Sequence, residues 1–484
     1  RNADGRFMVH ELMRQFTNEA LNSAGETKNV RSQHSRYYAE MLHQRHPDLV
    51  GGDHLGALAE IEVDFENIRA AWGWAVVQKD FNTLDILADS VCWYGQYRGR
   101  IRETAPLFRQ AQEALAEQTE TDARLAWGRM VSYQMHSNDF RREKPAPLKR
   151  ALAFAQEHND HKGAALLLWA LGTLFCLKET DYERAIPFYQ QSALGFKKLG
   201  KHIYWGWAML MLGVYYHELD QEELGLSMIQ ETLDSYREQG NRFGIAISLF
   251  MMGVRLFNEG KLKQTEGYYQ EAIEMHRELG NHMWAANTAE WYGWLLAIRG
   301  EYDEAKRLAK ECLETGREIN NVVLITQGLA LQADIELRAE NYTEAKVLFE
   351  EALALDPPYI VHFHAALGLG IISTAQGDLK AGKEELVEFL GKVPSKIDTV
   401  SYFQLWLYIL GEQGRNEEAV EILAFIDNYK SSLPKKNMVG FPWYKRLAPE
   451  LETALSAEAY AAAYERGKTL ELDEIKKYIL TDVD

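Results

Sequence analysis

Apolar residues recur along most of the chain at the spacing of amphipathic helices, and no run shows the strict alternation of a half-buried strand. Eleven prolines in 484 residues also favour an all-helical chain. Glycines interrupt this pattern at regular places, as at Gly293 in the stretch WYGWLLAIRGEYDEA (residues 291–305). Glycine inside a helix costs about 1 kcal/mol relative to alanine, so we expect each of these glycines to have a packing role.

Small residues form pairs that are 12 positions apart. Gly293 is followed by Ala305, and the same spacing recurs at Gly213/Gly225, Gly253/Thr265, Ala333/Ala345 and Gly370/Gly382. The second member advances by 40 residues from position 185 to position 345 and by 37 thereafter. A third small residue follows seven positions later in most units, and Gly or Asn stands where each helix should stop. A fixed period of this length predicts stacked units of helix, turn, helix and stop.

This pattern resembles the tetratricopeptide repeat, in which small residues let two antiparallel helices approach closely. The match is closest in EYDEAKRLAKECLE (residues 301–314) and NYTEAKVLFEEALAL (residues 341–355). The resemblance implies an all-α fold, a right-handed superhelical solenoid of helix pairs. We expect about eight repeats over residues 122–430, with degenerate terminal repeats, and capping helices over residues 431–484.

Residues 1–121 do not follow the period. Residues 34–46 and 64–78 are amphipathic helices, and residues 93–111 join two more, so we expect a helical arm over residues 26–121. Residues 7–21 predict a short strand end entering a helix, and residues 1–25 are taken as the end of a preceding domain.

The arm region resembles the junction that follows the winged-helix domain in signal-transduction ATPases with numerous domains (STAND), the family of the bacterial maltose-regulon activator. Val9-His10-Glu11 stands where that family has Met-His-Asp. The resemblance implies that residues 1–25 are the C-terminal end of the winged-helix domain and that His10 senses the β-phosphate of ADP in the full-length parent. Val9 and Glu11 depart from the motif, so this role rests on His10 alone, and the alternative is an exposed histidine at a helix start.

The chain itself contains no Gly-x-x-x-x-Gly-Lys-Ser/Thr loop. We therefore expect no cofactor in this part, with ATP or ADP bound by the nucleotide-binding domain of the full-length parent. The chain begins with Arg1 rather than Met, which also suggests a piece of a longer protein.

The net charge of −18 argues against direct binding of nucleic acid, because phosphate repels an acidic surface. The sequence contains no run of 18 apolar residues, so we do not expect a membrane span. Three widely separated cysteines do not suggest a disulfide framework, and a cytoplasmic location fits best.

No catalytic constellation is apparent, so we expect no enzyme activity in this chain. His43 and His46 lie three residues apart, but nothing nearby in the sequence completes a metal site, and a solvated helix face is favoured. Cys312 occupies a small packing position and is expected to be a core thiol.

The first helix of a tetratricopeptide unit usually lines the concave surface. The inward positions that the family implies form one row in each repeat, and these rows contain five large aromatics, two carboxylates and no Lys or Arg. The alternative is that the register is shifted and these aromatics belong to the core. The ligand-binding candidates are Trp169, Trp207, His217, Phe250, Phe257, Asn287, Glu290, Trp294, Gln327, Asp334 and His364.

Such a groove suits a neutral or cationic ligand, for example a sugar, a peptide or an amine, and disfavours a polyanion. The first hypothesis is therefore the sensor and arm of a STAND ATPase, which recognises an inducer in its groove and relays this event to the nucleotide-binding switch. The alternative is a constitutive scaffold that binds a protein or peptide partner.

Overall fold

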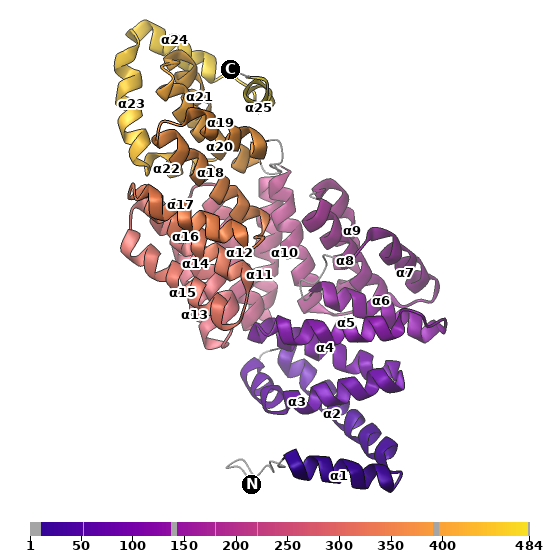
Figure 1. The fold of residues 1–484 in the computed structure, drawn as a ribbon. Coiled ribbons are helices and arrows are strands. Elements are labelled where there is room, and N and C mark those ends of the chain that lie inside the picture. Colours follow the sequence, from indigo (N-terminus) through magenta and orange to yellow (C-terminus); the bar gives the residue numbers. More distant parts are fainter. Residues whose placement is uncertain are drawn as a thin grey trace. The chain divides into compact units, whose positions relative to one another are not determined.

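Every element of regular secondary structure that the computed structural model describes is an α-helix (Figure 1). The structure describes residues 11–51, 53–136, 143–179, 181–219, 221–390 and 396–482. The predicted all-α class is thus confirmed. The strand end predicted at the start of residues 7–21 cannot be compared with the structure over residues 7–10, which include His10 and lie outside the described ranges. Glu11–Ser23 is helical.

The chain forms two compact units. The first contains residues 1–209 and 237–242, and the second contains residues 210–236 and 243–484. The first unit holds α1 (Glu11–Ser23), α2 (Thr27–Val50), α3 (His54–Gln78), α4 (Phe81–Arg98), α5 (Ile101–Leu115), α6 (Thr121–His136), α7 (Pro145–Glu157), α8 (His161–Glu179), α9 (Tyr182–Lys198) and the beginning of α10 (His202–Glu218).

The second unit holds the remainder of α10 and most of α11. Its helices are α11 (Glu222–Glu238), α12 (Arg242–Asn258), α13 (Leu262–Glu278), α14 (His282–Arg299), α15 (Tyr302–Glu318), α16 (Val322–Arg338), α17 (Tyr342–Ala354), α18 (Tyr359–Ala375), α19 (Leu379–Leu390), α20 (Lys396–Glu412), α21 (Asn416–Asn428), α22 (Leu433–Val439), α23 (Pro442–Ala454), α24 (Ala457–Gly467) and α25 (Leu472–Thr481).

The helices from α8 to α21 alternate with the period that the sequence predicts. From α14 to α20 each first helix packs against its own second helix, as α14 does against α15, and against the second helix of the preceding repeat. The first helices of successive repeats, α14, α16, α18 and α20, also pack against one another. They form a continuous inner row, and this row carries the candidate site.

The predicted helix stops have the backbone conformation that ends helices. Gly300 caps α14 with a φ of 82°, and Asn320 follows α15 with a φ of 51°. Both angles lie in the left-handed region, which glycine and asparagine tolerate best.

The pair Gly213/Gly225 is a point of close helix contact, whereas the close neighbour of Gly293 is Leu331 of α16, with the carbonyl oxygen of Ala305 at 3.7 Å from an added Cβ. A Cβ atom added to Gly225 in α11 would lie 2.5 Å from the carbonyl oxygen of Gly213 in α10, so neither residue can be larger without moving the backbone. Gly253 differs from the prediction, because the space beside it is filled by the ring of Tyr269 rather than by Thr265. The missing Cβ at Gly253 leaves room for this ring between the two helices.

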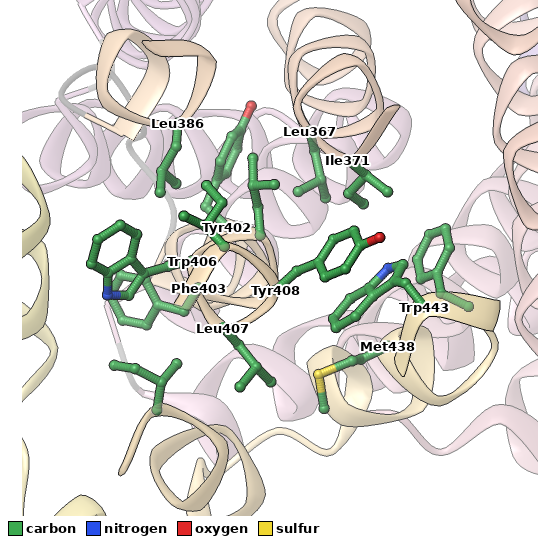
Figure 2. Packing of buried hydrophobic residues seen from close by; sticks show 14 of the residues in the cluster. Leu367, Ile371, Leu386, Tyr402, Phe403, Trp406, Leu407, Tyr408, Met438 and Trp443 are labelled. Carbon is green, nitrogen blue, oxygen red and sulfur yellow. The ribbon is translucent and has the colours of Figure 1, made fainter. Parts of the chain in front are cut away.

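The last repeats and the C-terminal helices share a dense aromatic core (Figure 2). Trp406 and Tyr402 of α20 are fully buried in it. Tyr408, also in α20, stacks on Trp443 of α23 with ring centroids 4.6 Å apart. Within the described part of the chain, no helix has the length and apolar character that crossing a membrane requires.

Residues 431–441, here called the return segment, contact helices far away in the sequence. The segment contains α22 and runs past the ends of first helices of earlier repeats. The hydroxyl of Ser431 donates to the carbonyl of Asn258 at the end of α12, and Nζ of Lys436 donates to the carbonyl of Gly260 at 2.5 Å. Arg338, at the end of α16, donates to the carbonyl of Asn437 at 3.2 Å. The return segment therefore encloses part of the inner row.

Candidate functional site

The inner row of the second unit and the return segment together enclose a cavity of about 90 Å³. One buried water needs roughly 10–15 Å³, so the cavity has room for a group of several heavy atoms. Its described lining contains three carboxyl groups and no Lys or Arg. The lining residues are Phe257, Asn258, Glu290, Trp291, Trp294, Ile298, Gln327, Asp334, Leu337, Ile360, Phe363, His364, Leu367, Gly368, Ile371, Asp398, Ser401, Leu433, Asn437 and Phe441.

The repeat period explains why several predicted site residues meet here. Trp294, Asp334 and Ile371 occupy equivalent positions in three successive first helices, and so do Gln327 and His364 in the last two. The predicted site residues that line the cavity are Phe257, Glu290, Trp294, Gln327, Asp334 and His364.

Three predicted residues of the second unit do not line the cavity. Asn287 accepts a long hydrogen bond of 3.5 Å from Nε2 of Gln327. Phe250 is buried against Trp284 and Trp291, in keeping with the core alternative. His217 is buried near the end of α10, where burial and then the charge of Arg255 lower its pKa to about 4.

Two predicted aromatics belong to the first unit. Trp169 stacks on His136 with ring centroids 3.6 Å apart. Trp207 packs edge-on against Trp93 with ring centroids 6.2 Å apart. These rings form an aromatic cluster of their own between α4, α6, α8 and the beginning of α10.

Glu290 has no cationic partner among the described residues. Its Oε1 accepts a hydrogen bond of 2.5 Å from the indole Nε1 of Trp294, one turn further along α14. Its Oε2 is buried and has no hydrogen-bond partner among the described residues. Burial raises the pKa of Glu290 to about 8, against the opposing effect of the Trp294 hydrogen bond. The carboxyl group is therefore mostly protonated at pH 7.

His364 is an uncharged part of the wall. Its ring stacks on Trp294 with centroids 4.1 Å apart and an interplanar angle of 20°. Burial, assisted by the positive charge of Arg338, lowers the pKa of His364 to about 3. The neutral imidazole therefore covers one face of the Trp294 indole and helps to hold it in place.

Asp334 is paired with Arg338, a residue that the sequence analysis did not include among the site candidates. Arg338, one turn later in α16, has a fully buried side chain and places its Nε 2.6 Å from Oδ2 of Asp334. The guanidinium also lies over the ring of Phe441, 4.0 Å from its centroid. The sequence could have predicted this ion pair, because an Asp and an Arg four residues apart on one helix lie on the same face.

The first unit contains a second buried polar cluster that the sequence analysis missed. Asp89 in α4 accepts hydrogen bonds from the hydroxyls of Tyr133 and Tyr204 and forms an ion pair with Lys162, with Nζ 3.0 Å from Oδ2. Burial alone would raise the pKa of Asp89, but Lys162, His46 and Lys201 hold it below its usual value. The carboxylate is fully satisfied, so this cluster links helices and does not form an open site.

No group of three or more His, Cys, Asp or Glu side chains that could hold a metal occurs in the described ranges. The three cysteines are buried free thiols, and Sγ of Cys312 contacts the carbonyl of Leu324 at 3.4 Å. Cys312 is thus a core residue, as its packing position predicted.

Comparison with known proteins supports the repeat assignment. A family model of the tetratricopeptide repeat matches residues 244–318, which cover α12 to α15. Candidate HTH-type transcriptional regulators of Mycobacterium tuberculosis and Mycobacterium bovis are 28% identical over 196 residues, covering 39% of this chain. The chain spans about a fifth, 21%, of the length of these relatives.

Solved structures with a similar course of helices have low sequence identity. The Rap protein complexed with competence and sporulation factor is 13% identical with a TM-score of 0.47, covering 75% of this chain and 97% of its own. The apo quorum sensor NprR from B. thuringiensis is 14% identical with a TM-score of 0.46, covering 81% and 99%. The human IFIT1 dimer with m7Gppp-AAAA is 12% identical with a TM-score of 0.43, covering 86% and 94%. Resemblance at this level carries no information about ligands.

Proposed function

We propose that this chain is the sensor region of a larger regulatory protein and that it recognises an inducer in the cavity of its second unit. The observation that carries the proposal is the arrangement of Glu290, Trp294 and His364. A buried acid with one unpartnered oxygen stands beside stacked aromatic rings in a cavity that has room for a small group. Aromatic walls with a few polar groups are typical of small-ligand sites.

The return segment gives the cavity a means of sensing occupancy. Leu433, Asn437 and Phe441 form part of its lining, and the segment is attached to the inner row through Arg338 and Lys436. A ligand that favours the docked over the released arrangement of this segment would shift the equilibrium between the two. Ligand binding would thereby be coupled to the C-terminal helices.

The proposal also covers the full-length parent protein to which this chain would belong. The first 120 residues resemble the arm of a STAND ATPase, and the curated relatives are about five times as long as the part that matches. We propose that an upstream nucleotide-binding switch in the full-length parent receives the signal. His10, outside the described residues, would serve that switch. The alternative of a constitutive scaffold requires no small-molecule ligand.

The test is a thermal-shift screen of this chain against a library of metabolites and short peptides. A true ligand should raise the melting temperature of the parent chain, because binding to the native state stabilises it. The same ligand should have no effect on Trp294→Ala. The matched control is Trp74→Ala, which removes a half-buried indole from α3 in the first unit and should leave the response intact. A screen in which every stabilising ligand acts equally on Trp294→Ala would overturn the proposal.

A further inference from the structure

The carboxyl groups of the cavity differ in how their charge is compensated. Asp334 has the guanidinium of Arg338 at 2.6 Å, inside the protein. Glu290, with 5% of its surface exposed, has no cation among the described groups that influence it, and within the described ranges only the Trp294 indole donates to it. A buried carboxylate without a cation is costly, so the empty site keeps a proton in place of one.

The rest of the lining suits a cation. The rings of Phe257, Trp291 and Trp294 line the same cavity as the acid, and the described lining contains no Lys or Arg that would repel a positive charge. A cation near the face of an aromatic ring is attracted by its quadrupole, and most strongly by tryptophan. An anionic ligand would meet three carboxyl groups and no lining cation, and is disfavoured.

Building on the proposed function, we propose that the group bound in this cavity is an organic cation, an ammonium or guanidinium, paired with Glu290 and packed against Trp294. The cation would take the place of the proton, form the ion pair through the free Oε2, and leave the Trp294 hydrogen bond to Oε1 in place. The cavity has room for the end of such a molecule, either a free amine or the side chain of a lysine or arginine in a peptide.

Binding should release a proton. At pH 7 the free carboxyl is mostly protonated, and the ion pair requires it to ionise, so one amine bound corresponds to nearly one proton released. Tyr269, Cys312 and His364 should stay neutral at this pH. Burial raises the pKa of Tyr269 in α13 and of Cys312 in α15, and it lowers that of His364 in α18. Among the residues that line the cavity, the other acidic groups are Asp334, which is paired with Arg338 of α16, and Asp398 of α20.

The experiment compares probes of similar size, one with an ammonium group and the other uncharged. Butylamine and 1-butanol are titrated into the whole chain by calorimetry at pH 7, in phosphate and in MOPS. The two buffers differ in ionisation enthalpy, so together they report the number of protons released. A second pair consists of acetyl-Gly-Lys-Gly-amide and its norleucine analogue, which separates a peptide source from a free amine.

We expect butylamine to bind at least tenfold more tightly than 1-butanol, with close to one proton released. Glu290→Gln should reduce this preference to near parity and abolish proton release. The matched control Glu266→Gln removes a half-buried carboxylate, paired with Arg299, that does not line the cavity, and it should behave as the parent does. A lysine peptide that binds more tightly than butylamine would indicate a peptide source, and the reverse order a free amine.

Three results would overturn the cation assignment: equal binding of amine and alcohol, an unchanged preference in a folded Glu290→Gln, or no binding of any probe at millimolar concentration. If Glu290→Gln does not fold, the proton count on the parent chain decides alone, and a count near zero overturns the assignment. A neutral ligand from the thermal-shift screen that depends on Trp294 would leave the proposed function standing while removing the cation. A screen without any Trp294-dependent ligand would remove both.

Discussion

The indole Nε1 of Trp294 donates a hydrogen bond of 2.5 Å to Oε1 of Glu290, one helical turn earlier in α14. This contact fixes the orientation of both side chains within the cavity. It also leaves the second carboxyl oxygen, Oε2, buried without a partner among the described residues. Trp294 is therefore an aromatic wall held beside an acid that has no counter-charge among the described residues.

Glu290 should make the protein less stable as the pH rises. Its pKa is about 8 in the folded chain and near 4.5 in the unfolded chain, so its contribution is fully present below pH 4.5 and is lost as the pH rises through 8. Between pH 6.5 and 8 the free energy of unfolding should fall by about 1 kcal/mol per pH unit relative to Glu290→Gln. Urea unfolding of both chains at several pH values measures this difference. Parallel pH profiles of the two chains would contradict the raised pKa.

Gly225→Ala should destabilise the second unit, whereas Gly267→Ala should not. A methyl group at Gly225 meets the carbonyl oxygen of Gly213 at 2.5 Å, and such overpacking costs about 1–3 kcal/mol. Gly267, in the middle of α13, has no atom within 4 Å of the added Cβ. Its replacement should stabilise the protein by about 0.5–1 kcal/mol through helix propensity alone. Melting temperatures of both variants test the prediction, and similar shifts would mean that the 12-residue pairs are not contact points.

Gly260→Ala should release the return segment. Gly260 has a φ of +73°, and an added Cβ would lie 2.8 Å from the backbone nitrogen of Leu433 in the return segment. Gly300→Ala is the matched control, because its φ of +82° gives the same backbone strain with nothing within 4 Å. Both variants should lose roughly 1–2 kcal/mol from strain. Only Gly260→Ala should also show faster amide hydrogen exchange over residues 431–441, and equal exchange in the two variants would show that the segment is held elsewhere.

Arg338→Met should destabilise the second unit strongly because it leaves Asp334 buried without its cation. Breaking one side of a buried ion pair typically costs about 3–5 kcal/mol. The double variant Asp334→Leu/Arg338→Met removes both charges and should recover most of this loss. Denaturant unfolding of the parent, the single variant and the double variant measures the effect. A double variant no more stable than Arg338→Met would show that the arginine acts mainly through Asn437 and Phe441.

Much of the fold was determined by the sequence alone. The 40-residue period and the small residues at Gly213 and Gly225 located the helix pairs, because a repeat protein is built from contacts between helices that are neighbours in the sequence. The same period placed Glu290, Trp294 and Asp334 on one face of the inner row. Periodicity of 3.6 residues and a fixed repeat length are local properties, so they can be recognised without knowing the tertiary structure.

Only the tertiary structure decided what covers that face. Ser431 and Asn258 are 173 residues apart and bond through a hydroxyl and a backbone carbonyl, so no periodic pattern relates them. The return segment was therefore expected only as part of the capping helices. The protonation state of Glu290 could not be predicted from the sequence either, because its pKa depends on burial beneath side chains from several helices. Local patterns determine helices and their neighbours, whereas the enclosure of a cavity depends on contacts between segments that are distant in the chain.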